Sequence, residues 1–193
     1  IMSKPELRQT LHNFMFFAMM VSYLEIVVNI ISFQGMSIKF LYVIIFAIGA
    51  GAFITLLTSL FPVTVNKIIA WTISAFLVVY YCVQYIYRCI FGSFMEIYLI
   101  GMGGEAITNF TKETIDVILH NLIIIILMAL PLLVLAVLLK LKYVKLERNK
   151  IRFTVTEAGV IAVYHILCVL SLRLGGTGAY TVYSNYHDVN TVT

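Results

Sequence analysis

Several side chains that can carry a charge lie inside or at the edge of long apolar stretches, among them Glu25, Arg88, His165 and Arg173. A carboxylate within a membrane span is disfavoured by a few kcal/mol, so it is usually paired or neutralised. At about 1.5 Å of rise per helical residue, Glu25 lies roughly 10 Å and His165 roughly 13 Å inward of the outer ends of their stretches. These depths predict a polar cluster of Glu25 and His165, with Arg88 or Arg173, that holds the first, third and fifth helices together. The alternative is that Glu25 faces a wet groove alone.

A second candidate region is the fragment 92–116, "GSFMEIYLIGMGGEAITNFTKETID". It is too polar to cross a membrane, its glycines can adopt positive φ, and Thr111 or Thr114 can cap a helix. This pattern predicts a segment in the outer membrane interface that turns its acidic residues toward water and shapes a lateral opening for lipid headgroups. A plain spacer is the alternative. The candidate lipid-facing or substrate-orienting residues are Glu96, Gly101, Gly103, Gly104, Glu105, His120 and Asn121.

Motifs for bond-making chemistry are not expected in this chain. The three cysteines, Cys82, Cys89 and Cys168, fall in apolar stretches without CxxC or Cys/His spacing, which favours a packing role over a disulfide or zinc. The sequence also lacks HExxH, GxGD and a Ser/His pair at a suitable depth for an intramembrane protease. We therefore predict no catalytic residue, no metal ligand and no cofactor within these residues.

The composition identifies the class of protein in which these residues must be positioned. Of 193 residues, 62% are hydrophobic and 11% are charged, whereas soluble domains are about half apolar and one-quarter charged. The formal charge of +4 is concentrated in "KLKYVKLERNKIR" (140–152), which holds six of the thirteen basic residues. A basic cluster directly after an apolar stretch is typical of a cytoplasmic topology signal, and a specific anionic partner is the alternative. We expect a membrane protein that does not bind nucleic acid.

Five stretches are about as long as the roughly 20 residues that a bilayer core requires. We therefore predict an all-α membrane protein with a five-helix transmembrane domain over 1–174. Its outer interfacial segment, 92–116, lies between the third and fourth helices, and an extracellular linker follows at 175–193. The predicted spans are 11–32, 38–61, 67–91, 117–139 and 153–174.

Basic residues predict the orientation of these spans. With the N-terminus inside, the inner side holds nine basic residues: Lys4, Arg8, Lys67 and the six of the 140–152 cluster. The outer side holds four: Lys39, Arg88, Lys112 and Arg173. The excess on the inner side favours an N-in, C-out orientation.

Small residues and prolines predict local packing. The "AIGAGA" stretch at 47–52 brings Ala47, Gly49 and Gly51 close together, a pattern that lets another helix approach. Pro62 interrupts the inner turn between the second and third helices. Pro131 is expected to kink the fourth helix or to be compensated by a neighbour.

The order of these features resembles one known family. Five spans, "GMGGEAITNFTKETIDVILHNL" before the fourth helix, a "GGxGxY" turn after the fifth, "YLEIV" in the first and "LLTSLF" closing the second are all present. Together they resemble the membrane portion of the lipoteichoic acid synthase family, the sulfatase-like phosphoglycerol transferases of Gram-positive bacteria. The resemblance covers nearly the whole chain.

The resemblance implies a role in the bacterial plasma membrane. The helices would anchor and orient an extracellular domain, expected after residue 193, that builds polyglycerolphosphate from phosphatidylglycerol and leaves diacylglycerol. In the family, the threonine nucleophile and the divalent metal, usually manganese, belong to that outer domain, and no position in 1–193 matches its motif. The chain alone is expected to be inactive and the full-length protein to be a phosphoglycerol transferase. Expected partners are phosphatidylglycerol, other membrane lipids, the catalytic domain and copies of the same chain.

Two other functions stay open at the level of the sequence. A helical domain without its catalytic part resembles a non-catalytic subunit of a membrane complex. A small transporter is less favoured, because it should show inverted repeats or several paired charges within the membrane.

Overall fold

A computed structural model describes residues 4–33, 40–95 and 110–174. Within these ranges the chain forms helices and no strand. The helices are α1 (Lys4–Phe33), α2 (Phe40–Leu57), α3 (Val63–Phe91), α5 (Thr111–His120), α6 (Leu122–Lys140) and α7 (Ile151–Leu174). The predicted all-α class is confirmed for the part of the chain that the structure describes.

Four described helices contain stretches long and apolar enough to cross a membrane. They are Glu6–Ile31, Val63–Phe91, Leu122–Lys140 and Phe153–Leu170. The 18 residues of α2 give about 27 Å of helix, and its apolar stretch, Ile44–Leu57, is shorter than the other four. These helices indicate a membrane-embedded protein, and α2 corresponds to the second predicted span, 38–61.

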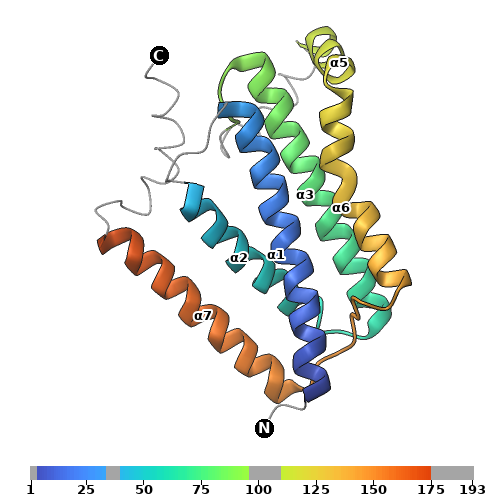
Figure 1. Cartoon of the computed structure of the whole chain (residues 1–193), viewed down its shortest axis with the longest axis vertical. Helices are drawn as coiled ribbons and strands as arrows, with labels where there is room; N and C mark the ends of the chain where they lie inside the picture. The colour runs from blue at the N-terminus through green and yellow to red at the C-terminus, as the bar shows by residue number, and fades with distance from the viewer. Residues whose placement is uncertain (1–3, 34–39, 96–109, 175–193) are drawn as a thin grey trace.

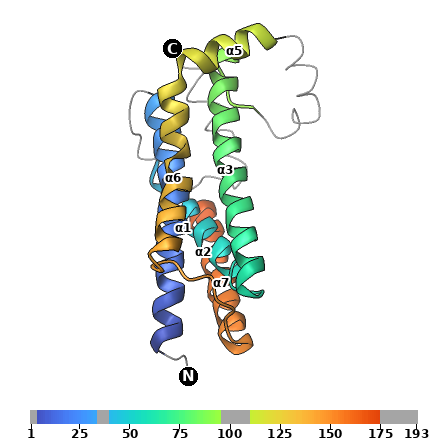
Figure 2. The same ribbon diagram turned by 90° about the vertical axis from the view of Figure 1, so that its right-hand side faces the viewer.

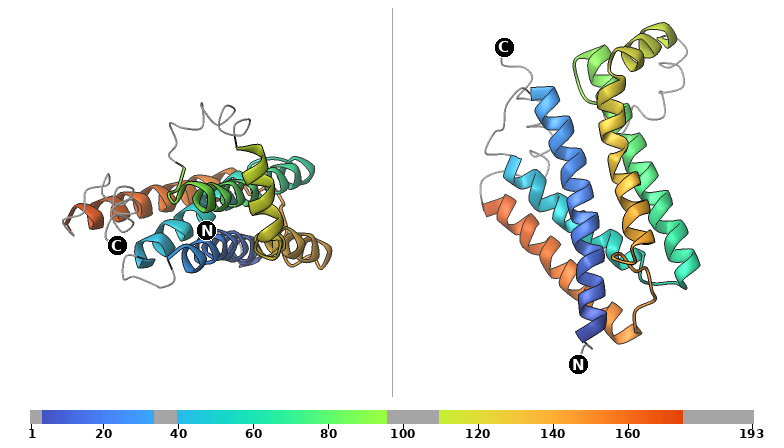
Figure 3. Two further views of the ribbon diagram at one scale, coloured as in Figure 1. Left: turned by 90° about the horizontal axis from the view of Figure 1, so that it is seen from above. Right: turned by 45° about the vertical axis from the view of Figure 1, so that its right-hand side comes forward.

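The helices form an open bundle with one helix across its end. In Figure 1, α1, α3 and α6 run lengthwise beside one another, whereas α2 and α7 cross obliquely. Among the described helices, α2 packs along α1, and α7 packs on α2 alone. Seen from the side, α5 lies across the ends of α3 and α6 (Figure 2), and the view from above shows it running from one toward the other (Figure 3).

Two glycines of α2 allow the close approach of different helices. A Cβ built at Gly51 would lie 2.5 Å from the backbone nitrogen and 2.8 Å from the Cβ of Ala18 on α1. A Cβ at Gly49 would lie 3.0 Å from Tyr164 Cε1 and 3.1 Å from His165 Nε2 on α7. The predicted close packing at 47–52 is confirmed, and the two glycines face two partners rather than one.

The core lies where α1, α3 and α6 meet. Its fully buried side chains include Phe17 and Leu24 of α1 together with Met128 and Leu135 of α6. Large apolar side chains on the outer surfaces of α6 and α7 are exposed, as expected for helices that face lipid rather than water. Apolar residues therefore cover both the inside and much of the outside of the bundle.

Several helix ends differ from the predicted spans: α1 begins at Lys4 instead of residue 11, and α3 begins at Val63 instead of residue 67. The second predicted span extends to residue 61, but α2 ends at Leu57, and the hydroxyls of Thr58 and Ser59 donate to carbonyls of its last turn. Pro62 then precedes α3, as predicted for this turn. The fourth predicted span begins at residue 117, but residues 117–120 belong to α5, and α6 begins only after a change of direction at Asn121.

The two ends of the bundle can be named by what they hold. The lower end contains the start of α1, the α2–α3 turn and residues 141–150, here called the strap, which connect α6 to α7. The upper end contains α5 and the glycine that ends α3. Gly92 has φ of 74° and donates its N–H to Arg88 O at 2.8 Å, a left-handed cap that suits glycine.

Candidate functional site

The intramembrane acid Glu25 bonds to the third helix. The Tyr81 hydroxyl of α3 donates to Glu25 Oε1 at 2.5 Å. One turn further along α1, the Asn29 amide lies 3.5 Å from Glu25 Oε2 and donates to the Glu25 carbonyl at 2.8 Å. Tyr81 and Asn29 are both buried. A carboxylate held by a phenol and an amide ties α1 to α3 and has a proton donor within direct reach.

His165 lies away from this carboxylate. It is on α7, where its Nδ1 lies 2.9 Å from the Ile161 carbonyl of its own helix. Its ring borders Gly49 of α2, and the neighbouring Tyr164 hydroxyl donates to the Ile45 carbonyl of α2 at 2.7 Å. Because α7 packs on α2 alone among the described helices, the structure does not bring His165 to Glu25. Similar depth did not imply the same side of the bundle.

The two arginines of the predicted cluster have different positions. The Arg88 guanidinium carbon lies 5.0 Å from the centre of the Phe94 ring, a cation–π contact just beyond the end of α3. Arg173 belongs to the last turn of α7, and its side chain is outside the described residues. Of the predicted links, that between the first and third helices is present, and Tyr81 forms it.

Asn121 forms the corner between α5 and α6. The Tyr85 hydroxyl of α3 donates to Asn121 Oδ1 at 2.8 Å, and Asn121 Nδ2 donates to the Val117 carbonyl at 2.9 Å. Its side chain thereby caps the end of α5 and fixes this end to α3. His120, at the last position of α5, is exposed.

The described part of the predicted interfacial segment fits a helix at the upper end. Every residue of α5 is exposed or only partly buried, and its acids Glu113 and Asp116 are exposed. Ile115 and Leu119 are exposed as well, at 51% and 62%. The Phe110 ring, just before α5, meets Phe91 edge-on at 5.1 Å, so both ends of the helix are attached to the bundle.

The chain that leaves α3 is held by one amide side chain. Gln84 is buried; its Nε2 donates to the Met95 carbonyl at 3.0 Å, and its Oε1 accepts from the Met95 N–H at 2.9 Å. Five further predicted residues, Glu96, Gly101, Gly103, Gly104 and Glu105, lie outside the described residues. Their roles stay predictions.

Pro131 leaves one carbonyl of α6 without its helical donor, and α1 supplies a replacement. A residue at 131 would normally donate its N–H to the carbonyl of Leu127, but proline has no N–H. The Tyr23 hydroxyl donates to Leu127 O at 2.9 Å. This is the compensation by a neighbour that the sequence predicted.

At the lower end, the strap is fixed to three other segments. Asn13 of α1 pairs with the backbone of Lys145, donating to its carbonyl at 2.7 Å and accepting from its N–H at 3.1 Å. Asn66 of α3 donates to the carbonyls of Leu146 at 3.1 Å and Phe61 at 2.6 Å, and accepts from the Phe61 N–H at 3.0 Å. The Asn149 N–H donates to the Ser59 carbonyl at 3.0 Å.

Side-chain burial confirms that the strap is an integral part of the bundle. Val144 and Leu146 are 2% and 1% exposed, whereas Lys142 and Lys145 are exposed. The His12 ring stacks on Tyr143 with centres 4.3 Å apart. The basic connection is therefore a docked segment with its cations on the outer side.

Several residues that organise these contacts carry little signal in the sequence. Asn13 and Asn66 are buried asparagines with distant backbone partners, and only an asparagine inside an apolar helix signals them. Glu157 is a second acid within an apolar stretch, and its Oε2 is buried without a hydrogen-bond partner among the described residues. Asn149, at the end of the strap, lies beside its carboxylate.

The described residues contain no group of three or more His, Cys, Asp or Glu side chains that could hold a metal ion. Their arrangement can bind helices together and position a surface helix. Comparison with protein-family models, with curated proteins and with solved structures finds no match for this chain.

Proposed function

We propose that this chain is the membrane anchor and lipid-orienting domain of a phosphoglycerol transferase. The full protein would transfer the glycerophosphate headgroup of phosphatidylglycerol to a polyglycerolphosphate chain in the bacterial plasma membrane. The lower end faces the cytoplasm, and the upper end faces the outer surface together with the chain beyond residue 174. A divalent metal, with manganese expected, would act in the outer domain.

The observation that carries this proposal is the placement of α5. It lies across the bundle at the end opposite the basic strap, and the Tyr85–Asn121 hydrogen bond fixes its angle to α6. Such a helix provides a surface at headgroup depth beside the ends of α3 and α6. The resemblance of the sequence to the synthase family supplies the chemistry that would use this surface.

The proposal is tested by expressing the full-length protein in a bacterium that lacks its own polyglycerolphosphate synthase. Polymer and diacylglycerol should both appear at the expense of phosphatidylglycerol. Tyr85→Phe should lower polymer formation about fivefold at equal protein level. The lost hydrogen bond is worth about 1 kcal/mol, which changes the equilibrium constant for holding α5 in this position by about that factor. Tyr87→Phe is the matched control, since Tyr87 contacts Phe91 by its ring. Failure of the unaltered protein to form polymer would leave the non-catalytic subunit as the better account.

A small transporter is the second candidate, and one observation favours it more than the sequence suggested. The structure places two acids, Glu25 and Glu157, within apolar helices on opposite halves of the bundle. Acids at two depths are a feature of proton pathways. Proton-coupled uptake of a solute into vesicles that contain the purified chain would favour transport over lipid orientation if Glu25→Gln abolished it.

A further inference from the structure

The strap presents cations in a fixed arrangement. Lys142, Lys145, Arg148 and Lys150 are all exposed, while buried residues between them hold the backbone. Lys150 of this group forms an ion pair with Glu6, with 3.3 Å between Lys150 Nζ and Glu6 Oε1. Because the backbone is already ordered, binding a ligand to these cations orders only their side chains.

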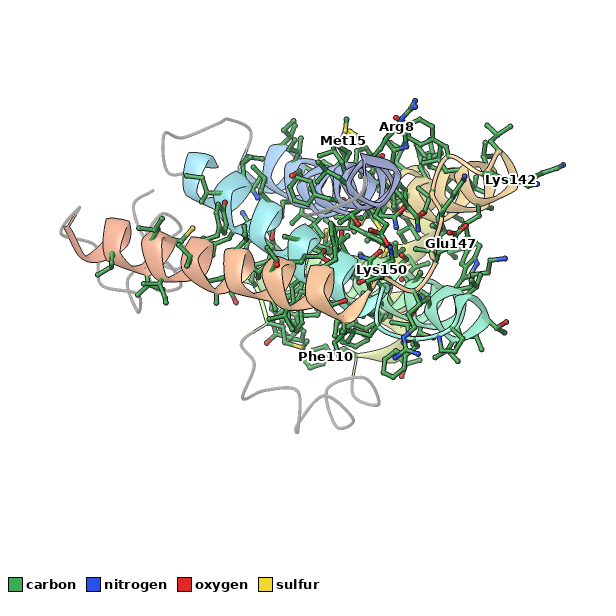
Figure 4. The ribbon with its side chains drawn as sticks, turned by 90° about the horizontal axis from the view of Figure 1, so that it is seen from below. Arg8, Met15, Phe110, Lys142, Glu147 and Lys150 are labelled. Atoms are coloured by element: carbon green, nitrogen blue, oxygen red, sulfur yellow. The ribbon has the colours of Figure 1, made fainter. Side chains whose placement is uncertain are left out.

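Charge is distributed unequally between the two ends of the bundle. The described part of the lower end holds seven cationic side chains against the carboxylates of Glu6, Glu147 and the partly buried Glu157. The seven are Arg8, Lys67, Lys140, Lys142, Lys145, Arg148 and Lys150. At the upper end, Arg88 and Lys112 are balanced by Glu113 and Asp116. Figure 4, seen from below, shows Arg8 and Lys142 pointing outward from the edge of the bundle.

Apolar side chains between these cations identify the kind of partner. Leu141 and Tyr143 are 70% and 46% exposed, directly beside Lys142 and at the end of the lipid-facing helix α6. Exposed leucine and tyrosine alternating with lysine is the pattern of a surface at the boundary between acyl chains and headgroups. The headgroup boundary of a membrane accommodates both the cations and these apolar groups.

We propose that the strap is a binding surface for the headgroups of anionic phospholipids in the leaflet at the lower end. Lys142, Lys145 and Arg148 contact the headgroup phosphates, while Leu141 and Tyr143 lie among the upper acyl carbons. Bound lipid stabilises the strap and, through it, the attachment of α1, the α2–α3 turn and α7. This surface is distinct from the outer surface of the proposed function and does not depend on it.

The test compares nanodiscs of phosphatidylcholine with nanodiscs that also contain phosphatidylserine, an anionic lipid that is not the proposed substrate. The chain should melt at a higher temperature in the nanodiscs that contain phosphatidylserine than in those of phosphatidylcholine alone. Native mass spectrometry of the chain released from the mixed nanodiscs should show more bound phosphatidylserine than phosphatidylcholine. Lys142→Gln, Lys145→Gln and Arg148→Gln together should weaken retention by about fivefold for each cation removed. All three side chains are exposed, so the fold in phosphatidylcholine should be unchanged.

A charge-conserving variant separates binding from damage. Lys142→Arg with Lys145→Arg and Arg148→Lys should keep the preference for phosphatidylserine, and Lys112→Gln at the upper end should keep it too. An undiminished preference in the glutamine variant would overturn the proposal. Equal stabilisation by soluble glycerol phosphate would also overturn it, since the site would then bind a free anion rather than a lipid.

Discussion

The hydrogen bond from Tyr23 to Leu127 permits a sharp test of how α1 and α6 are joined. Tyr23→Phe removes the donor and leaves the Leu127 carbonyl without the partner that Pro131 cannot supply. A hydrogen bond between membrane helices contributes about 0.6 kcal/mol on average and up to about 1.7 kcal/mol. The freed carbonyl has no helical donor, so we expect a loss near the upper value, about 1.5 kcal/mol.

Pro131→Ala changes the expected result. Alanine restores an N–H that can donate to the Leu127 carbonyl, so Tyr23→Phe should then cost no more than about 0.5 kcal/mol. The two substitutions should therefore be coupled by about 1 kcal/mol. Reversible unfolding in mixed micelles, followed by far-UV circular dichroism, gives the four free energies of the cycle.

Tyr87→Phe controls for the loss of a hydroxyl on a helix, because Tyr87 contacts Phe91 by its ring. It should change the free energy of unfolding little in either background. An equal cost of Tyr23→Phe with proline and with alanine at 131 would refute the assignment of this hydroxyl as the substitute donor.

Three further substitutions test the packing and the polar contacts. Gly51→Ala should cost about 1–3 kcal/mol of unfolding free energy, because the new methyl overlaps the Ala18 backbone, whereas Gly159→Ala, with open space around it, should cost nothing. Asn66→Ala should cost about 2–4 kcal/mol, since the strap and the α2–α3 turn both lose bonds. Tyr81→Phe should weaken the α1–α3 contact by about 1–2 kcal/mol. The packing of α7 on α2, measured by crosslinking between these two helices, should stay unchanged.

Apolar length and local chemistry made much of the fold predictable. The long stretches around Glu25, Gly51 and Pro131 are helices. Gly51 allows the close approach of another helix, and Tyr23 of a neighbouring helix compensates for Pro131, as expected. Glu25 bonds to Tyr81 of the third helix instead of to His165. Helical depth follows from counting residues, but the side of the helix that meets a given neighbour depends on how the helices pack. That is why the depth argument joined Glu25 to His165, although their helices α1 and α7 are not neighbours.

The helix ends and the strap depended on contacts that sequence distance conceals. Asn121 separates α5 from α6, and its side chain bonds to both Tyr85 and Val117 at this corner. Asn13 donates to the backbone of Lys145 in the strap, which is more than a hundred residues away in the sequence. A run of lysines predicted the membrane side of the connection, but not that the connection would be docked. The glycines at 101–104 are outside the described residues and stay a prediction.

Single-cysteine labelling measures the orientation on which the whole account depends. In a background without the three native cysteines, Lys112→Cys on α5 and Lys145→Cys on the strap are each treated with a membrane-impermeant maleimide. The account predicts that intact cells label position 112, whereas position 145 is labelled only after the membrane is permeabilised. Labelling of position 145 in intact cells, with position 112 protected, would contradict it.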